Sequence, residues 1–488
     1  MRIEKDALGE LPVPEEAYYG IQTVRCAQNY DVTDHTFNEL PHVIRAVAEV
    51  KKAAALANKE IKALEAHKAD AIAQACDEII AGKLSDQFPV NIWRSHGTGV
   101  NMNVNEVIAN RANEILTGRK GYDEVHPNTH VNMCQSSNDT YPAAEAIVLY
   151  RMIKKTVESV KYFEDALKEK AIEFKDLPRL GRTCMQDAVP MTFGQVFAAW
   201  QSLVQRNRKR LEKLLPEYQE TILGATVLGS GMGEMPGYNE AVYKHLSDIV
   251  GFEMRQAKNK DEVIEDSALF DGSQNNDSFI YLLGVLKCIA SAGGRIGNDL
   301  YIFSSGPRTG IGEFILPSIA PGSSIMPGKI NPYMPEMLLQ IMQQVISHDM
   351  MATLTVNESD LDLCSSTCGS FLGAMESLEL IEKGFRLVAD LCIKGIQVNA
   401  ELARKNAEMS TSLATMVSAL YGYPIGTKIA HKAFNEGKSC KEVALEEGLI
   451  DPKIAEELFD VRKLADRKET IRVCTSVCLD VVPVRSIW

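Results

Sequence analysis

The sequence predicts an all-α protein built around a bundle of long helices. Five segments of more than about twenty residues repeat apolar side chains at three- and four-residue spacing, the period of a buried helix face. No strand-like alternation of apolar and polar residues separates these segments. The chain has 488 residues, of which 45% are hydrophobic, so it has ample apolar content for large cores.

The N-terminal residues predict an irregular arm followed by a helix. Pro12, Pro14 and Gly20 interrupt residues 1–40, which we therefore expect to lack regular structure. After Pro41 an alanine-rich stretch carries one apolar stripe, which predicts a helix to about residue 61.

The middle of the chain predicts the longest helices. The five segments are 142–167, 191–215, 279–302, 335–356 and 371–398. Helices of this length without intervening strands favour an up-and-down bundle. The last three segments are apolar on more than one side, so we expect bundles of several subunits to pack together as a homo-oligomer.

Beyond residue 395 the pattern breaks into short helices separated by glycine and proline. We therefore predict an N-terminal helical domain over residues 1–140, a central long-helix domain over 141–395 and a small C-terminal helical domain over 396–488.

The composition disfavours several classes of partner. The chain has 52 basic and 65 acidic residues, a net charge of −13, and no basic run interleaved with aromatics, so neither nucleic acid nor an anionic membrane surface is an expected partner. The first residues do not resemble a targeting signal, and we see no run of about 18 apolar residues. The prediction is a cytoplasmic protein.

The 11 cysteines do not suggest disulfides or a metal centre. Their odd number without a signal peptide favours reduced thiols. Two pairs, Cys364 with Cys368 and Cys474 with Cys478, have helical spacing, but no histidine or further cysteine pair lies near them to complete a zinc site. We predict no bound metal and no cofactor.

One loop concentrates both backbone breakers and reactive side chains. It runs Gly322-Ser323-Ser324-Ile325-Met326-Pro327-Gly328-Lys329-Ile330-Asn331-Pro332. Glycines and prolines at this density exclude a helix or strand interior. The serines, the lysine and the asparagine supply a nucleophile or base, an anion partner and an amide donor, and Gly322 with Gly328 could hinge a closing lid. On these residues alone, a surface turn is an equally good interpretation.

This loop resembles the signature of the aspartase/fumarase superfamily. The resemblance implies that Ser323 is the catalytic base, that Ser324 lies beside it in the site, and that Lys329 and Asn331 hold a substrate carboxylate. It also implies a three-domain all-α fold and a homotetramer with composite active sites, around a core of many helices. The substrate would be a small amino acid or dicarboxylate.

A second block, residues 94–103, extends the resemblance. Its glycines precede a helix expected over Val104 to Leu116, and free N–H groups at a helix start suit an anion. Thr98 matches a substrate-binding threonine, and Asn103 is a further candidate for binding. The block departs from its relatives at His96, where they carry a small residue, and at Gly99, where they carry serine or glutamine.

A third block, residues 126–139, places three polar side chains before a helix expected to begin near Pro142. Ser136, Ser137 and Asn138 match the second signature of the superfamily and imply carboxylate binding. Without the resemblance, a helix cap would be the better interpretation. Thr129 stands where aspartate is usual, which weakens any transfer of the accessory site of some relatives.

The fourth block, residues 181–190, contains Thr183 and Cys184, both expected near the substrate. Fumarases have a histidine in place of Cys184, paired with a glutamate that would here be Glu336. A neutral thiol is a poor proton carrier, so this dyad is absent.

The resemblance implies an anti-elimination, and the leading hypothesis is an ammonia-lyase that converts aspartate to fumarate. Residues 333–336 and 304–308 favour it because both are closer to aspartases than to fumarases. A fumarate hydratase is second. His96 and Cys184 keep a third open, an amine lyase with another substrate, such as ergothionase, which releases trimethylamine. An inactive structural homologue is the non-enzyme alternative. The sequence does not decide between the substrates, the direction of reaction, activation by a divalent cation or the role of the C-terminal tail.

Overall fold

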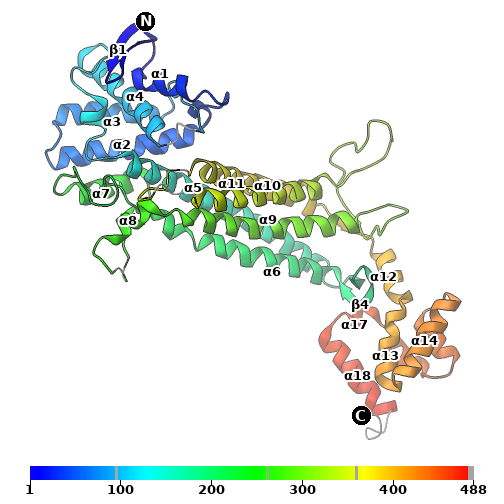
Figure 1. Cartoon of the computed structure of the whole chain (residues 1–488). Coiled ribbons are helices and arrows are strands. Elements are labelled where there is room, and N and C mark those ends of the chain that lie inside the picture. The colour runs from blue at the N-terminus through cyan, green and yellow to red at the C-terminus, as the bar shows by residue number, and fades with distance from the viewer. Residues whose placement is uncertain (94–96, 260, 262, 358–360, 366, 482–488) are drawn as a thin grey trace. The chain divides into compact units, whose positions relative to one another are not determined.

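Helices make up most of the structure. The computed structural model describes residues 1–481 apart from 94–96, 260, 262, 358–360 and 366. Figure 1 shows long helices as the main elements. Within the described residues the strands pair only two by two, as β1 with β2, β3 with β4, β5 with β6, and β7 with β8. The all-α fold class predicted from the sequence is confirmed.

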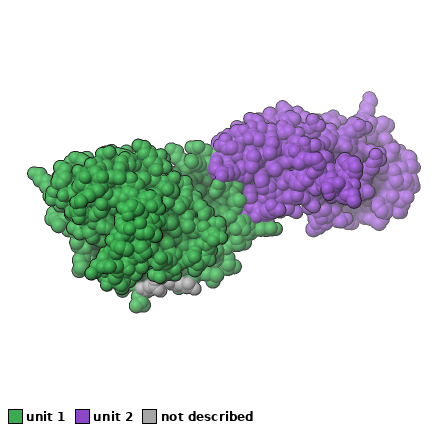
Figure 2. Space-filling model, turned by 90° about the horizontal axis from the view of Figure 1, so that it is seen from above, with its two compact units in different colours: residues 1–158, 209–288, 343–381 green, residues 159–208, 289–342, 382–488 purple. Residues whose placement is uncertain are grey.

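The chain divides into two compact units, each assembled from separate stretches of sequence (Figure 2). Unit 1 comprises Met1–Glu158, Lys209–Cys288 and Gln343–Ile381, and unit 2 comprises Ser159–Arg208, Ile289–Met342 and Glu382–Trp488. The three domain boundaries drawn from the sequence stay a prediction.

The helices follow the order expected from the sequence. Those confined to unit 1 are α1 (Ile21–Asn29), α2 (Pro41–Glu60), α3 (Ala66–Ile80), α4 (Thr98–Thr117), α7 (Tyr238–Val250) and α8 (Ser267–Gln274). Long helices that contribute residues to both units are α5 (Ser137–Glu173), α6 (Phe193–Glu212), α9 (Asp277–Phe303), α10 (Tyr333–Val356) and α11 (Cys368–Val388). Those confined to unit 2 are α12 (Ala400–Met409), α13 (Ala414–Tyr421), α14 (Tyr423–Glu436), α15 (Cys440–Glu446), α16 (Pro452–Leu458), α17 (Val461–Leu464) and α18 (Arg467–Val481).

Three glycines allow the long helices of unit 2 to pack closely. A Cβ added to Gly293 of α9 would lie 2.7 Å from the ring of Phe385 on α11, and one added to Gly297 would lie 2.8 Å from the carbonyl oxygen of Pro335 on α10. One added to Gly294 would collide with Met342 of α10. The small-residue stripe of α9 therefore brings it against both neighbours, as the bundle prediction requires.

The expectation of an irregular N-terminal arm is wrong. Arg2–Asp6 (β1) and Gly9–Val13 (β2) form an antiparallel hairpin, and α1 follows. The Arg2 guanidinium donates to the carbonyl oxygens of Pro14, Ala17 and Tyr19, which ties the hairpin to the chain after it. Proline did not prevent this because Pro12 lies in a strand with a single neighbour.

Helices α4 and α5 begin earlier than the sequence suggested. Helix α4 starts at Thr98 and not near Val104, because Gly97 adopts φ +76 and turns the chain into the helix. Helix α5 starts at Ser137 and not near Pro142, which lies inside it. A proline in an early turn of a helix removes little hydrogen bonding, so it did not mark the boundary. Both shifts place candidate site residues on helix N-termini.

The helix α9 is long and apolar enough to cross a membrane by length and composition, contrary to the expectation that no such segment exists. Its most apolar window is 61% buried within the structure. The core helix of a bundle has the same properties, and the packing of Gly293 and Gly297 accounts for its burial.

The remaining strands and the short helices complete the fold. The strands are β3 (Pro178–Thr183), β4 (Gln186–Thr192), β5 (Glu220–Thr221), β6 (Arg255–Gln256), β7 (Phe314–Ile315) and β8 (Gln397–Val398). Helices α12 to α18 enclose a core of their own that includes Val417, Ile429 and Val443. The short helices expected beyond residue 395 are present.

Candidate functional site

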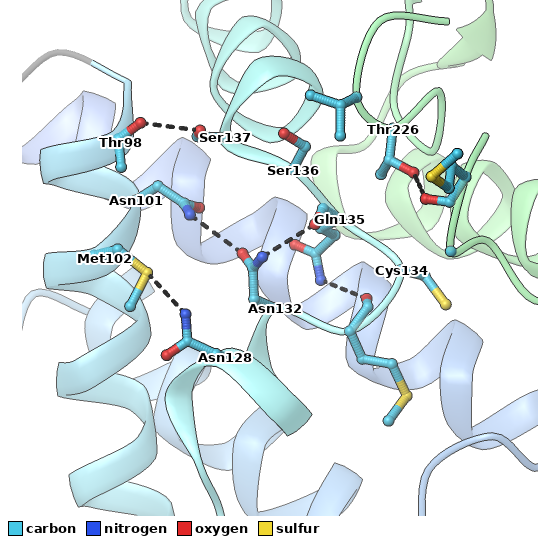
Figure 3. Close-up of a pocket in the computed structure, with 14 residues that line it drawn as sticks. Thr98, Asn101, Met102, Asn128, Asn132, Cys134, Gln135, Ser136, Ser137 and Thr226 are labelled. Carbon is cyan, nitrogen blue, oxygen red and sulfur yellow. Dashed lines mark hydrogen bonds between the residues drawn. The ribbon is translucent and has the colours of Figure 1, made fainter. Parts of the chain in front are cut away.

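A pocket of about 500 Å³ in unit 1 gathers residues from two of the sequence blocks (Figure 3). Helix α4, the segment that precedes α5, and a loop around Thr226 enclose it. The lining residues are Thr98, Asn101, Met102, Asn128, Asn132, Met133, Cys134, Gln135, Ser136, Ser137, Thr226, Val227, Met232 and Gly233.

Two helix N-termini meet at this pocket. Thr98 opens α4 and Ser137 opens α5, and their hydroxyl oxygens lie 3.2 Å apart. The first N–H groups of a helix have no partner within the helix and carry a partial positive charge. The hydroxyls of Thr98 and Ser137 therefore lie where an anionic group is favoured.

The turn before α5 is held by its own side chains. The Asp139 carboxylate accepts the N–H of Ser136 at 3.0 Å, and the Ser136 hydroxyl accepts the N–H of Asn138 at 3.2 Å. The Asn138 amide donates to the carbonyl oxygen of Val227 at 3.2 Å. The position of Asn138 is thus linked to the loop around Thr226.

This loop is part of the site that sequence reasoning missed. Residues 224–233 contain four glycines, and Gly224, Gly229, Gly231 and Gly233 all have positive φ. A non-glycine residue would be strained at each of them. The density of glycines and prolines helped to single out residues 322–332, and the four glycines of residues 224–233 could have drawn attention to this loop in the same way.

Asn103, expected to bind substrate, faces the core instead. It lies inside α4, is fully buried, and donates to the carbonyl oxygen of Gln87 at 3.0 Å. His96 lies outside the described residues.

The signature loop lies in unit 2, between β7 and α10, and is closed by hydrogen bonds at its base. The Gly322 N–H donates to the Lys329 carbonyl oxygen at 2.9 Å, and the Asn331 amide donates to the Gly322 carbonyl oxygen at 2.8 Å. The Tyr333 hydroxyl donates to the Pro321 carbonyl oxygen at 2.8 Å. A Cβ at position 322 would lie 2.8 Å from the Asn331 nitrogen and closer still to the Lys329 oxygen, so only glycine fits there.

Ser323 is prepared to carry negative charge. Its hydroxyl oxygen accepts the backbone N–H of Ile325 at 3.2 Å and that of Met326 at 3.0 Å. Two N–H donors stabilise an alkoxide more than a neutral hydroxyl. Ser323 and Lys329 line a cavity of about 480 Å³ formed by the loop itself, while Ser324 is exposed.

Thr183 and Cys184 lie at the exposed tip of the β3–β4 hairpin in unit 2. Cys184 and Met185 have φ of 52° and 62°, as a tight two-residue hairpin turn requires. Arg179 and Arg182 below the tip contact the buried Glu313 carboxylate at 3.1 and 2.7 Å. The hairpin is therefore firmly anchored while its tip is open to solvent.

The structure thus distributes the predicted site residues over both units. Unit 1 brings together Thr98, Ser136, Ser137 and Asn138, whereas unit 2 carries the loop residues, the hairpin tip, and Glu336 in the first turn of α10. Among the side chains that the structure describes, no three of His, Cys, Asp or Glu lie together as metal ligands.

The chain is similar to known lyases over most of its length. A lyase family model matches residues 9–347, and a model for the C-terminus of fumarase C matches residues 413–466. Aspartate ammonia-lyase of Bacillus subtilis (strain 168) is 39% identical over 462 residues, which cover 94% of this chain and 94% of that protein. Fumarate hydratase class II of Halalkalibacterium halodurans is 36% identical over 467 residues, which cover 95% and 98%.

A solved structure is similar over nearly the same length. The fumarate lyase:delta crystallin of Brucella melitensis, in its cobalt-bound crystal, superposes with a TM-score of 0.90 at 38% identity and covers 95% of this chain and 99% of its own. The full-length matches and the four sequence blocks agree. The chain belongs to the aspartase/fumarase superfamily of lyases.

Proposed function

We propose that the chain is an ammonia-lyase that eliminates ammonia from L-aspartate and gives fumarate. The observation that carries the proposal is the Ser323 hydroxyl, which accepts two backbone N–H groups on the loop that Gly322 closes. A base of this kind suits abstraction of a weakly acidic proton next to a carboxylate. The relatives named aspartate ammonia-lyase support the choice of substrate.

The proposed reaction has two linked bond changes. The Ser323 alkoxide takes a proton from the carbon beside the β-carboxylate, and the electron pair left there spreads into that carboxylate as an enediolate. The pair then forms the C=C bond as the C–N bond of the neighbouring carbon breaks, and ammonia leaves with the electrons of that bond. The ammonium group of aspartate needs no added proton to depart.

The hydroxyls of Thr98, Ser136 and Ser137 would stabilise the enediolate. Each preorganised donor to such an oxyanion is worth on the order of 3 kcal/mol in comparable sites. Lys329 and Asn331 would hold the other carboxylate of the substrate, with Ser324 beside them. Asn138, Thr183 and Cys184 would surround the departing nitrogen.

The site would be assembled from different subunits of a homotetramer. Two observations support this. The candidate residues are divided between two units. Large apolar side chains on the long helices are exposed in the single chain, such as Tyr281, Met350 and Leu354 with exposed fractions of 56%, 62% and 61%. Surfaces of this kind are usually covered by another subunit.

Fumarate hydration is the second candidate, because a fumarate hydratase is among the relatives. Cys184 argues against it, since hydroxide is a poor leaving group that needs a general acid, and a thiol is a weak hydrogen-bond donor. An amine lyase with another substrate is the third candidate.

The test is to incubate purified protein with L-aspartate, L-malate or ergothioneine and to record the unsaturated product and the released amine. Fumarate and ammonia from aspartate support the proposal. Trimethylamine from ergothioneine, without reaction of the other two, would move the assignment to the third candidate. Inactivity with all three would favour a structural homologue.

A further inference from the structure

A lysine lies buried beneath the pocket of unit 1, and the proposed reaction does not use it. Lys51 is on α2 and is fully buried. Its Nζ donates to the Asn132 side-chain oxygen at 2.9 Å. Lysine is almost never fully buried unless it is paired, so this position needs an explanation.

Asn132 connects the buried lysine to the pocket wall. Its side-chain oxygen also accepts from the amides of Asn101 and Asn105 at 3.2 and 3.1 Å, and its own amide donates to the Gln135 carbonyl oxygen at 3.0 Å. Asn101, Asn132 and Gln135 all line the pocket, and Ser136 and Ser137 follow directly (Figure 3). One oxygen thus collects three donors and fixes the chain just before the two serines.

The buried Asp139 side chain braces the other end of the same segment. It is almost fully buried and accepts the N–H of Ser136 and the hydroxyl of Thr140. Burial lowers the pKa of Lys51 to about 7 and raises the pKa of Asp139 to about 7, and in each case the opposite charge partly offsets the effect of burial. An Nζ–H donor remains in either protonation state of the amine, so the bond to Asn132 persists.

We infer that Lys51 is a positioning residue: acting through Asn132, it sets the orientation of the turn that presents the Ser136 and Ser137 hydroxyls to a substrate carboxylate. This inference rests on the proposed function only in naming the carboxylate ligand. A loosened turn weakens binding of the carboxylate, and it also misplaces donors that the transition state requires.

The test compares Lys51→Met with Lys52→Met. Methionine is an unbranched side chain one atom shorter than lysine, and it lacks the N–H donor. Lys52 is the next residue of α2, and its ammonium pairs with Asp77 instead. In variants that retain the wild-type oligomer and circular dichroism, we expect Lys51→Met to lower kcat/KM for aspartate at least 10-fold and to raise the inhibition constant of succinate, a dicarboxylate that cannot react. Lys52→Met should stay within 2-fold of wild type for both.

The relay through Asn132 has its own test. Asn132→Ala should reproduce the loss, and the double variant Lys51→Met/Asn132→Ala should lose no more than about the larger single loss, since the two residues act as one unit. Additive losses would overturn the inference, as would Lys51→Met within 2-fold of wild type. If neither single variant folds, the role of Lys51 is purely structural and the inference is wrong.

Failure of the inference is distinguishable from failure of the proposed function. If the wild-type protein is inactive with aspartate, the proposed function fails. Stabilisation of the wild-type protein against thermal unfolding by succinate would still measure binding of a carboxylate at the pocket of unit 1. Loss of that protection in Lys51→Met but not in Lys52→Met supports the inference. Equal protection of both variants overturns it.

Discussion

At the scale of single residues, the backbone N–H groups around Ser323 indicate how its hydroxyl could act as a base. The hydroxyl accepts from Ile325 and Met326, the two residues that turn the chain back over it. The sequence identified the serine through its motif, but only the fold shows where stabilisation of an alkoxide would come from. Because the Ser323 hydroxyl is on this loop, it contributes little to the hydrophobic core.

Ser323→Ala should therefore abolish turnover, by about 1,000-fold or more, without loss of fold, because an exposed loop hydroxyl contributes little to stability. Initial rates, circular dichroism and size-exclusion chromatography check this. Ser347→Ala is the matched control, since Ser347 is an exposed serine on α10. Turnover by Ser323→Ala near the wild-type rate would exclude this serine as the base.

The buried Lys51 gives a prediction for the pH dependence of stability. Burial lowers its pKa from 10.5 to about 7, against the opposing effects of Asp139 and Cys76. Between these values the unfolded chain binds the extra proton, so the contribution of Lys51 to the free energy of unfolding rises with pH, by at most about 1.4 kcal/mol per pH unit. Asp139, with its pKa raised from 3.8 to about 7, acts in the opposite direction between those two values.

We expect the rise in stability between pH 7 and about pH 9 to be smaller in Lys51→Met than in wild type. Urea unfolding of both proteins at the two pH values measures the difference. Loss of the Lys51 charge also raises the pKa of Asp139, which changes the stability in the same direction, and shifts of groups away from this pair cancel in the comparison. Parallel stability profiles for the two proteins would contradict the assignment of this shift to Lys51.

At the scale of elements, loops decide how the candidate site is built. Gly322 lies where a Cβ would collide with the Lys329 oxygen and the Asn331 nitrogen, so the loop closes on itself only with glycine. Gly328 faces open space but has φ +83, which also favours glycine. The two glycines constrain the loop for different reasons.

Gly322→Ala should lower kcat at least 10-fold and change the thermal unfolding midpoint by less than about 3 °C, because the strained loop is exposed and outside the core. Enzyme kinetics and thermal unfolding measure the two quantities. Gly82→Ala, at a glycine with positive φ and open space around it, is the control for backbone strain without a collision. Equal effects of both substitutions on kcat would show that closure of the loop by Gly322 is unimportant.

Periodicity identified the long helices, because burial on a bundle imposes a three- and four-residue spacing that few other structures share. It did not find their starts. Helix α4 begins at Thr98 because of the backbone conformation of Gly97, and α5 includes Pro142. The spacing of apolar residues therefore does not predict either helix start. The hairpin of β1 and β2 was missed because its prolines suggested irregular structure, although a strand with a single neighbour tolerates proline.

The candidate site was only partly predictable for a similar reason. Thr98, Ser136 and Ser137 belong to motifs and line one pocket, but Asn103 from the same motifs is buried against Gln87. Spacing alone does not tell which side of a helix is turned to a pocket. The role of Asn132 depends on hydrogen-bond donors from α2 and α4. These donors are far apart in the sequence, so no local sequence pattern connects them.

At the scale of the whole molecule, one chain carries its candidate site residues in two units. It also exposes large apolar side chains on its long helices. Both facts support a complete site that combines segments of different subunits. The superfamily resemblance implies the same arrangement.

Mixing the inactive variants Ser323→Ala and Thr183→Ala under conditions that exchange subunits should restore activity. If the two residues of one site come from different chains, about a quarter of the sites in randomly mixed oligomers receive both wild-type residues. A mixture of Ser323→Ala with Lys329→Ala is the control, because both changes lie in one loop and should not complement each other. Mixed oligomers that form but stay inactive would rule out the shared site.

The central claim is that this lyase expels an amine and not water. The most direct measurement is the initial rate of fumarate formation from L-aspartate and from L-malate, at equal enzyme and saturating substrate. Hydroxide needs a general acid to leave, and Cys184 stands where the resemblance implies a histidine in fumarases, so we expect aspartate to react faster by about 100-fold or more. Malate that reacts as fast as aspartate, or faster, would contradict it.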